Sequence, residues 1–447
     1  MTENIEGGSP EQAESSDQQQ RSADTITLVL TADNHLGYTA FGQHPRKREE
    51  QQQRLRHAFQ QATDFAIDQR VDFFMQAGDL FDSTSPDERD RSFVSACLAQ
   101  LRQADVRVFA LGGVHDTPPE THSLLGEVAQ APQASFAHLG VMHYFAPNPP
   151  LPPLPASAMN RGHTPVMVKV RDVQVGICGL GVLAGQEGNP LTLMKEQSEV
   201  ERATISLLLL HAPIEGLTVG TSLLDSRAQV SRSSIENQSL FRYILAGYHH
   251  SYQHLRIGHC EVIVAGATQR IDFSTPEQEP GFVFLGLAAD GIRWCKHIAV
   301  DSLKLQRLLI QTSELWTDDS NIPDSTPTDA IIERLQPLCS EETMVQLRLA
   351  GTLTRGQYHQ LDLNQIRRYG EEHCFALAID DSGLEILPEI DAISAETGER
   401  FSPREELIAL VDEWITASLA AHDEQEQKAL HATKEDLLAA MDEVKRR

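Results

Sequence analysis

Aspartate and histidine residues recur in this sequence at the points where short apolar runs end. Both side-chain types can bind metal ions, and carboxylate with imidazole suits Mn²⁺, Fe or Zn²⁺. The five places are Asp33-Asn34-His35, Gly78-Asp79-Leu80-Phe81-Asp82, Gly113-Val114-His115-Asp116, His211 and Gly247-Tyr248-His249-His250. Ligands of open α/β sheets gather at the carboxyl ends of strands, so we expect these residues to converge on one metal site.

Each motif has an ordinary structural explanation when it is taken alone. An isolated Asp-x-His is more often a helix cap with a hydrogen-bonded histidine, and an isolated Gly-Asp is commonly a turn. Five such motifs in order, each at the end of an apolar run, favour the metal site. The glycines that precede Asp79 and the histidine-bearing turns permit close backbone approach.

The elements that would position these residues follow an α/β pattern. Several of the apolar runs are continuous, as in strands that are covered on both faces. The candidate strands are 26–32, 71–77, 106–111, 173–179, 205–210, 243–247, 262–266 and 282–287. Between the first two, Leu55, Phe59, Ala62 and Ala66 recur at helical spacing. The sequence therefore predicts a layered α/β domain.

The rest of the chain divides by composition. Residues 1–23 are polar, with few large apolar side chains, and are expected to be a disordered tail. We assign 24–302 to the main domain and 303–390 to a smaller α+β domain, with strands at 344–350 and 374–379 and a helix at 362–372. Residues 391–447 are expected to form amphipathic helices.

Composition limits the class of protein. The chain has 447 residues, enough for two or three domains, and a net charge of −27, which disfavours general polyanion binding but permits a local nucleic-acid site. No run is long enough to cross a membrane and no apolar signal core opens the sequence, so a cytoplasmic protein is expected. Six scattered cysteines without a Cys-x-x-Cys pair make a zinc ribbon or disulfide framework unexpected.

Several longer motifs resemble those of a known family. Residues 31–38 (Thr-Ala-Asp-Asn-His-Leu-Gly-Tyr), 78–82, 266–270 with 280–283, and 351–355 are similar to segments of the calcineurin-like metallophosphoesterases. Within that family they resemble the SbcD / meiotic-recombination-eleven type nuclease subunit of double-strand-break repair complexes, over about residues 25–390. The resemblance implies a β-sandwich of two sheets flanked by helices, followed by a capping domain.

The resemblance also implies two Mn²⁺ ions. Asp33, His35 and His250 would hold the first, and Asp79 would bridge to a second that His211 also binds. Two positions depart from the family pattern: Val114 stands where an Asn ligand is expected, and Tyr248 stands in place of a His. Water, Tyr248 as a phenolate, or His249 would have to complete the second site; otherwise the chain holds one ion.

The remaining site residues have implied roles. By the resemblance, His115 sits beside the phosphate and protonates the leaving oxygen, while Asp116 orients His115 through a ring N–H. The ordinary alternative for His115 is a turn residue that caps the following segment. Asp82 either holds a metal-binding histidine or is a helix N-cap, and the sequence leaves both open.

A basic cluster follows the first motif. Arg46, Lys47 and Arg48 are expected in a loop where a phosphate backbone could dock, with Arg270 and Arg355 as weaker DNA-binding candidates. The alternative is a solvated loop whose charges pair with Glu49 and Glu50.

Partner binding is expected near the C-terminus. Leu407, Leu410 and Trp414 lie on one side of a predicted helix that could simply pack on the body of the protein. The resemblance implies instead that this segment binds the coiled coil of an SbcC-like ATPase, and that the chain forms a homodimer.

The leading function is therefore that of a metal-dependent DNA exonuclease and endonuclease, which hydrolyses phosphodiester bonds of double-stranded ends and single strands with a metal-activated water. One alternative is a weakened or inactive member that binds DNA ends and serves as a scaffold for the ATPase. Another is a phosphoesterase for small phosphodiesters, which the resemblance of the capping domain disfavours.

Overall fold

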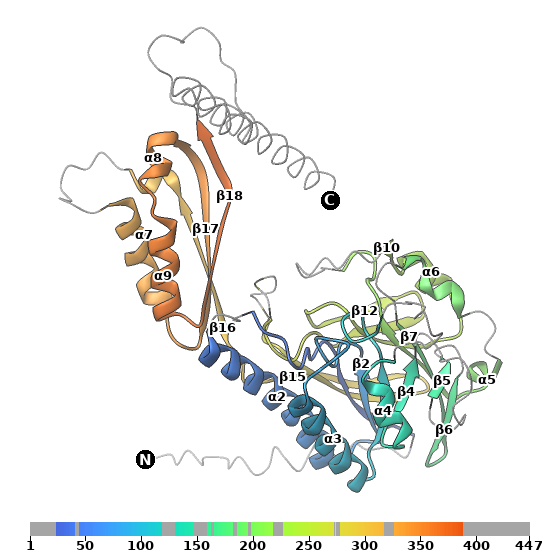
Figure 1. The fold of residues 1–447 in the computed structure, drawn as a ribbon. Coiled ribbons are helices and arrows are strands. Elements are labelled where there is room, and N and C mark those ends of the chain that lie inside the picture. Colours follow the sequence, from blue (N-terminus) through green and yellow to red (C-terminus); the bar gives the residue numbers. More distant parts are fainter. Residues whose placement is uncertain are drawn as a thin grey trace, which may run out of the picture. The chain divides into compact units, whose positions relative to one another are not determined.

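The computed structural model describes residues 24–40, 44–118, 130–146, 159–161, 165–181, 186–194, 198–217, 227–271, 273, 278–316 and 326–387. The chain divides into two compact units, residues 1–304 and 305–447, which we call unit 1 and unit 2. Figure 1 shows their elements. No helix in the described part of the chain is both long and apolar enough to cross a membrane.

Unit 1 is built on two large sheets. The first has seven strands in the order β15-β14-β1-β2-β3-β4-β5, and the second has six in the order β12-β13-β11-β9-β7-β6. The first sheet comprises β1 (Ile26–Thr31), β2 (Phe73–Ala77), β3 (Arg107–Leu111), β4 (His143–Ala146), β5 (Met159–Arg161), β14 (Gly281–Ala288) and β15 (Gly291–Ala299). The second comprises β6 (Val166–Val170), β7 (Val173–Gly181), β9 (Ile205–His211), β11 (Tyr243–Gly247), β12 (Gln253–Ile257) and β13 (Cys260–Val264).

Strand direction places the functional ends together. Strands β1, β2 and β3 pair in parallel in the first sheet, and β7, β9, β11 and β13 pair in parallel in the second. The antiparallel strands lie toward the outside, with β14 and β15 at one edge of the first sheet and β6 and β12 at the edges of the second. The carboxyl ends of β1, β2 and β3 therefore share one edge, and so do those of β9 and β11.

The strands explain the layers, because their alternate side chains fill different cores. Leu28, Phe73 and Leu207 belong to a core between the two sheets. Val29 and Phe74, which point the other way, pack against helices on the outer face of the first sheet. The outer face of the second sheet has its own apolar core, here called the outer cluster, which includes Leu208. Apolar side chains on both faces account for the continuous runs in the sequence.

The helices of unit 1 cover these outer faces. α2 (Pro45–Asp68) and α3 (Glu88–Gln103) lie side by side, and both contribute to the core on the first sheet, as does α4 (Gln133–His138) (Figure 1). The short helices are α5 (Ser198–Glu201), α6 (Arg232–Asn237) and η2 (Pro190–Leu193), and β8 (Glu187–Gly188) pairs with β10 (Arg227–Ala228). The predicted α/β fold with two sheets and flanking helices is confirmed.

Unit 2 is a three-stranded sheet with helices. Its strands, in the order β16-β17-β18, are β16 (Lys304–Gln311), β17 (Thr343–Thr354) and β18 (Ala376–Leu387). Its helices are η3 (Thr312–Glu314), α7 (Pro327–Leu335), η4 (Gln336–Leu338), α8 (Arg355–His359) and α9 (Leu363–His373). The predicted strand–helix–strand order at 344–379 is present, and a core that includes Val345, Leu347 and Ile366 holds the unit together.

Two expectations need correction. Residues 45–48 belong to the first turns of α2 and not to a loop, because Pro45 occupies the first position of the helix, which needs no N–H. Cys339 and Cys374 form a disulfide, which the scattered spacing of the cysteines gave no reason to expect. The predicted tail 1–23 and the predicted helices beyond 391 lie outside the described residues.

Candidate metal centre

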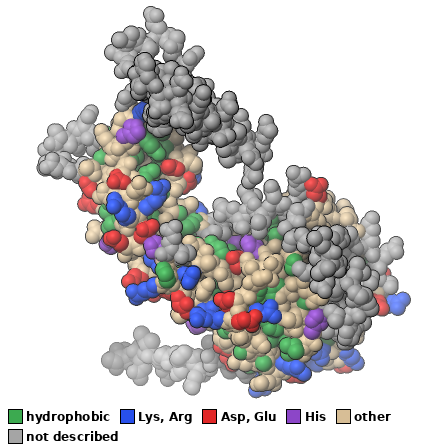
Figure 2. All heavy atoms as spheres, viewed as in Figure 1, with side chains coloured by type: hydrophobic (Ala, Val, Ile, Leu, Met, Phe, Trp, Pro, Cys, Tyr) green, Lys and Arg blue, Asp and Glu red, His purple; other side chains and the backbone are tan. Residues whose placement is uncertain are grey.

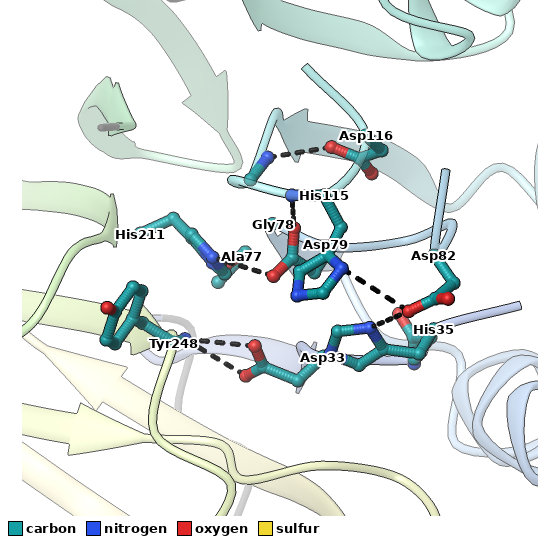
Figure 3. A network of polar contacts seen from close by, with 12 residues as sticks. Asp33, His35, Ala77, Gly78, Asp79, Asp82, His115, Asp116, His211 and Tyr248 are labelled. Carbon is teal, nitrogen blue, oxygen red and sulfur yellow. Dashed lines mark hydrogen bonds and ion pairs between the residues drawn. The ribbon is translucent and has the colours of Figure 1, made fainter. Parts of the chain in front are cut away.

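Six predicted site residues converge where the strands of the two sheets end. Figure 3 shows most of this cluster. There are three groups of residues, and within each group the donor atoms lie within 4.8 Å of one another. Some residues belong to more than one group. The groups are Asp33 with His35 and His250, His35 with Asp79 and His115, and Asp33 with Asp79 and His211. The strand-end motifs thus form one continuous donor cluster.

The first two motifs are held by backbone hydrogen bonds. The N–H of Asp33 donates to the carbonyl of Gly78 at 3.0 Å, and the N–H of His35 donates to the carbonyl of Asp79 at 3.0 Å. Asp33, His35 and Asp79 have φ of +47°, +45° and +51°. This left-handed region is uncommon for residues other than glycine and is often found at functional sites. Backbone strain here turns the donor side chains into the cluster.

Glycine is required beside two of these donors. A Cβ atom on Gly78 would overlap the imidazole of His211, and a Cβ atom on Gly113 would overlap the carboxylate of Asp79. The predicted close approach at these glycines is confirmed.

His35 is oriented as a metal ligand would be. Its Nδ1 lies 2.9 Å from Oδ1 of Asp82, whereas its Nε2 is buried and has no hydrogen-bond partner among the described residues. A carboxylate on one ring nitrogen fixes the tautomer and leaves the other nitrogen free to coordinate. The sequence left two roles open for Asp82, a contact with a metal-binding histidine or a helix N-cap. The structure shows the contact with His35, and the N-cap of α3 is Asp87.

His211 has a similar arrangement. Its Nδ1 donates to the carbonyl of Ala77 at 2.7 Å, and its Nε2 lies 3.1 Å from Oδ2 of Asp79. His211 is fully buried and Asp79 is 4 % exposed. Burial by itself would lower the pKa of His211, but the adjacent Asp79 outweighs it and raises that pKa to about 9. Burial alone would raise the pKa of Asp79, but His211, His35 and His115 together lower it.

These residues meet the requirements of a divalent cation. Asp33, His35, Asp79 and His211 are almost completely buried, and buried carboxylates are stable only when paired or bound to metal. Burial raises the pKa of Asp33, which reflects the cost of a buried charge that no cation balances. The donors are carboxylate and imidazole, without a thiolate, which suits the ions that the sequence suggested.

The structure changes the role of Asp116. One carboxylate oxygen accepts from the N–H of Gly113 at 2.8 Å; the other accepts from the N–H of Phe81 and from Nε2 of Gln133. The ring of His115 instead faces Asp82, with Nδ1 3.4 Å from Oδ1 (Figure 3). The expectation that Asp116 orients the ring of His115 is therefore wrong. Asp116 fixes the turn on which His115 stands.

The three residues considered for the second ion lie differently. Val114 is 7 % exposed and belongs to the outer cluster. Nε2 of His249 accepts the backbone N–H of Ile214 at 3.0 Å, and His249 appears in none of the donor groups, so the suggestion that it supplies a ligand is not supported. Tyr248 packs against the outer cluster, and its ring lies edge-on to His211 at 5.6 Å between centroids. Burial, with Asp79 and Asp33 nearby, raises the pKa of Tyr248, which disfavours a phenolate.

The DNA-binding candidates separate into two groups. Arg46 and Arg48 are exposed at the start of α2, and Glu49 and Glu50, their suggested partners, pair instead with Arg89 and Arg54. Arg270 is only 8 % exposed, and its guanidinium donates to the carbonyls of Leu303 and Gln278. This burial and these two hydrogen bonds do not support its expected place on a DNA-binding surface.

Lys47 and Arg355 are partly exposed, and Arg355 begins α8 of unit 2. On the face in Figure 2, Lys and Arg side chains are interspersed with Asp and Glu. Leu407, Leu410 and Trp414 lie outside the described residues.

Sequence reasoning overlooked Gln76, which supports the site from within β2. Its Nε2 donates to the carbonyl of Gly78 at 2.7 Å, and its Oε1 accepts the N–H of Gly78 at 3.2 Å. This pair of hydrogen bonds fastens the turn that carries Asp79. The signal was present, since Gln76 is the polar residue in the otherwise apolar strand Phe-Phe-Met-Gln-Ala.

The fold and the site define a class of protein. Residues 26–245 match the calcineurin-like phosphoesterase family, and this chain carries a domain of that family.

The relatives make the resemblance more specific. The DNA double-strand break repair protein Mre11 of Methanosarcina acetivorans is 32 % identical over 99 residues, which are 22 % of this chain and 15 % of that protein. The proteins of the same name from Methanosarcina mazei and Thermoplasma acidophilum are 30 % and 34 % identical over 116 and 88 residues. Those matches cover 24 % and 20 % of this chain, and 18 % and 22 % of the relatives. The chain thus spans less than a quarter of these relatives, and the resemblance to this type is confirmed over that part.

Proposed function

We propose that this chain is a metal-dependent DNA nuclease subunit that hydrolyses phosphodiester bonds at DNA ends. The observation that carries the proposal is the continuous donor cluster around Asp33 and Asp79. Asp33, His35, Asp79 and His250 would hold one Mn²⁺ ion, and Asp79, Asp33 and His211 offer a weaker set for another. A cation bound there would neutralise phosphate charge and act as a Lewis acid on the phosphodiester.

His115 is the residue placed to move a proton. It is 24 % exposed, whereas the metal-binding candidates Asp33 and His35 are 1 % exposed, so a substrate could reach it beside them. Asp82 faces Nδ1 of His115 and favours a proton on that nitrogen, which leaves Nε2 to exchange a proton with the leaving oxygen. Burial lowers the pKa of His115 and the carboxylates of Asp79 and Asp82 oppose that shift.

DNA as the substrate rests on the relatives, whose names assign them to double-strand break repair. The exposed Arg46 and Arg48 would contact the phosphate backbone without reading bases. Replacing both by alanine should weaken binding of any duplex. It should also make the slope of log affinity against log salt concentration shallower, by the amount expected for the loss of about two phosphate contacts. Unchanged salt dependence would move the DNA contact elsewhere.

The test of the activity uses linear duplex DNA with and without Mn²⁺. Asp79→Ala and His115→Ala should each reduce cleavage by about 100-fold or more. Asp172→Ala and His259→Ala, which change exposed residues of unit 1, are matched controls and should cleave normally. Activity that survives Asp79→Ala would refute the proposal, and preference for a chromogenic phosphodiester over DNA would favour the small-substrate alternative.

A second candidate is a scaffold that binds DNA ends and an SbcC-like ATPase but cleaves weakly. Val114 favours it, because this position faces an apolar cluster instead of offering a donor. If residues around Trp414 bind the ATPase, Trp414→Ala should abolish co-purification and leave the thermal unfolding of the chain unchanged. Co-purification of that variant would exclude this contact.

A further inference from the structure

A disulfide in unit 2 joins Cys339 to Cys374, which lie 35 positions apart with Cα atoms 4.7 Å apart. Cys339 follows α7 and η4, and Cys374 ends α9. The two longer helices, α7 and α9, are neighbours in the unit (Figure 1). The bond therefore fastens the carboxyl ends of adjacent helical segments.

The same junction is also held by hydrogen bonds. The N–H of Phe375 donates to the carbonyls of Ser340 and Thr343 at 3.1 and 3.0 Å, and the hydroxyls of Ser340 and Thr343 lie 2.5 Å apart. One residue later the parallel pairing of β17 with β18 begins, at Met344 and Ala376. Because these contacts span the junction independently, breaking the disulfide should loosen it without unfolding the unit.

The two sulfur atoms differ in access. Cys374 is 2 % exposed, whereas Cys339 is only partly buried. The other four cysteines are free; Cys97, Cys178 and Cys260 are buried, and burial raises the pKa of each to about 12. Such thiols are protonated at neutral pH and react slowly.

The remaining free thiol is Cys295, which is also only partly buried. Its Sγ lies 3.3 Å from the hydroxyl of Tyr252, and burial raises its pKa. Cys339 is consequently the position at which a small thiol reagent can enter and find a second sulfur in bonding range.

We propose that Cys339 and Cys374 form a reversible thiol–disulfide pair that tightens unit 2 when it is oxidised. With oxidised glutathione as the oxidant, the Cys339 thiolate attacks one glutathione sulfur and releases the first glutathione. Cys374 then attacks the sulfur of Cys339 and releases the second. The two protein thiols lose two protons and two electrons, and one glutathione disulfide becomes two thiols. The pair belongs to unit 2 and the donor cluster to unit 1, and this proposal does not depend on the proposed function.

The first test counts thiols in the full chain. Protein equilibrated with oxidised glutathione, then denatured and alkylated, should carry four alkyl groups, and protein treated natively with dithiothreitol should carry six. Cys339→Ser should carry five in both conditions. The control Cys295→Ser should carry three after oxidation and five after reduction. Six groups on oxidised wild type, or four that persist after native reduction, would overturn the proposal.

The second test measures what the bond does. Oxidation should raise the temperature at which unit 2 becomes sensitive to protease by about 5 °C or more, in the wild type and in Cys295→Ser alike. Cys339→Ser should show no such shift. The reduced wild type provides a thiol-containing reference if the serine variant is unstable, and equal temperatures for oxidised and reduced wild type would contradict the tightening.

Discussion

Oδ1 of Asp82 lies 3.4 Å from Nδ1 of His115, and the same oxygen lies 2.9 Å from Nδ1 of His35. A single carboxylate thus faces both the proposed proton-transfer residue and a candidate metal ligand, whose rings meet edge-on at 4.7 Å (Figure 3). Its charge favours the tautomer with the proton on Nδ1 in each ring, and this leaves Nε2 of each ring to interact with other groups.

Replacing Asp82 by asparagine should therefore affect two properties together. We expect Mn²⁺ affinity to fall by about 10- to 100-fold, because the ligand His35 loses its orienting charge. DNA cleavage at saturating Mn²⁺ should also fall, because His115 loses the same partner. Calorimetric titration and cleavage rates would measure the two effects, with Asp172→Asn as the control. Normal affinity in Asp82→Asn would show that the contact does not orient His35.

Metal binding should release protons. The pKa of His211, raised to about 9 by Asp79 despite burial, means that this imidazole is protonated near pH 7 in the metal-free protein. Metal binding requires its neutral form. The apparent affinity for the second ion, which His211 would bind, should consequently increase as pH rises toward 9 and flatten above it.

The number of protons released can be measured by calorimetry in buffers with different ionisation enthalpies. We expect His211 to release about one proton near pH 7 when the second, more weakly bound ion enters the set formed by Asp33, Asp79 and His211. Titration of His211→Gln should release fewer protons than titration of the wild type. Heats that do not depend on the buffer would contradict the protonated state of His211.

The two sites for cations should differ in affinity. Val114 lies in the outer cluster and His249 bonds to the backbone of Ile214, so neither completes a second ligand set. We expect one tight Mn²⁺ per chain and a second that binds at least about 10-fold more weakly through Asp33, Asp79 and His211.

The combined variant Val114→Asn and Tyr248→His should tighten the second ion and leave the first unchanged. Calorimetry gives the stoichiometry, and the electron paramagnetic resonance spectrum of Mn²⁺ distinguishes single from coupled ions. Val114→Ala, which alters packing without adding a donor, is the control. Two equally tight ions in the wild type would show that the second site is already complete.

His143 should make stability depend on pH. It lies between Phe109 and Phe145, with ring centroids at 5.7 and 4.9 Å, and burial lowers its pKa to about 4. As the pH falls below about 6.5, the unfolded chain takes up the proton first, so this contribution to stability is complete above 6.5 and is lost between 6.5 and 4.

His143→Phe should accordingly lose less stability between pH 7 and pH 5 than the wild type does, as measured by thermal unfolding. His138→Phe makes the same exchange at an exposed position, and its stability should change with pH as that of the wild type does. Identical pH dependence of stability for wild type and His143→Phe would contradict the lowered pKa of His143.

Sequence patterns predicted the buried strands of the two large sheets. All eight candidate strands are present, because continuous apolar runs between polar turns identify strands covered on both faces. The convergence of Asp33, Asp79 and His211 followed from strand ends in parallel sheets. The strands β6, β12 and β15 were not anticipated, since they are partly exposed and less uniformly apolar.

Side-chain direction was harder to predict. Asp116 is adjacent to His115 in sequence, yet its carboxylate bonds to the N–H of Gly113 three residues back, which leaves the ring to Asp82. Arg270 has the charge of a DNA contact, but its guanidinium is used by carbonyls from Leu303 and Gln278. The contacts of His115 with Asp82 and of Arg270 with Leu303 join segments far apart in sequence, which local spacing does not specify.

The backbone hydrogen bonds from Asp33 to Gly78 and from His35 to Asp79 continue the parallel pairing of β1 and β2 beyond the last residues of the strands. A further bridge pairs Leu36 with Phe81. The donor turns are thus an extension of the sheet itself, and backbone hydrogen bonds hold them as they hold its strands. An arriving cation meets atoms already in position, little ordering entropy is lost on binding, and the metal-free and metal-loaded backbones should superimpose.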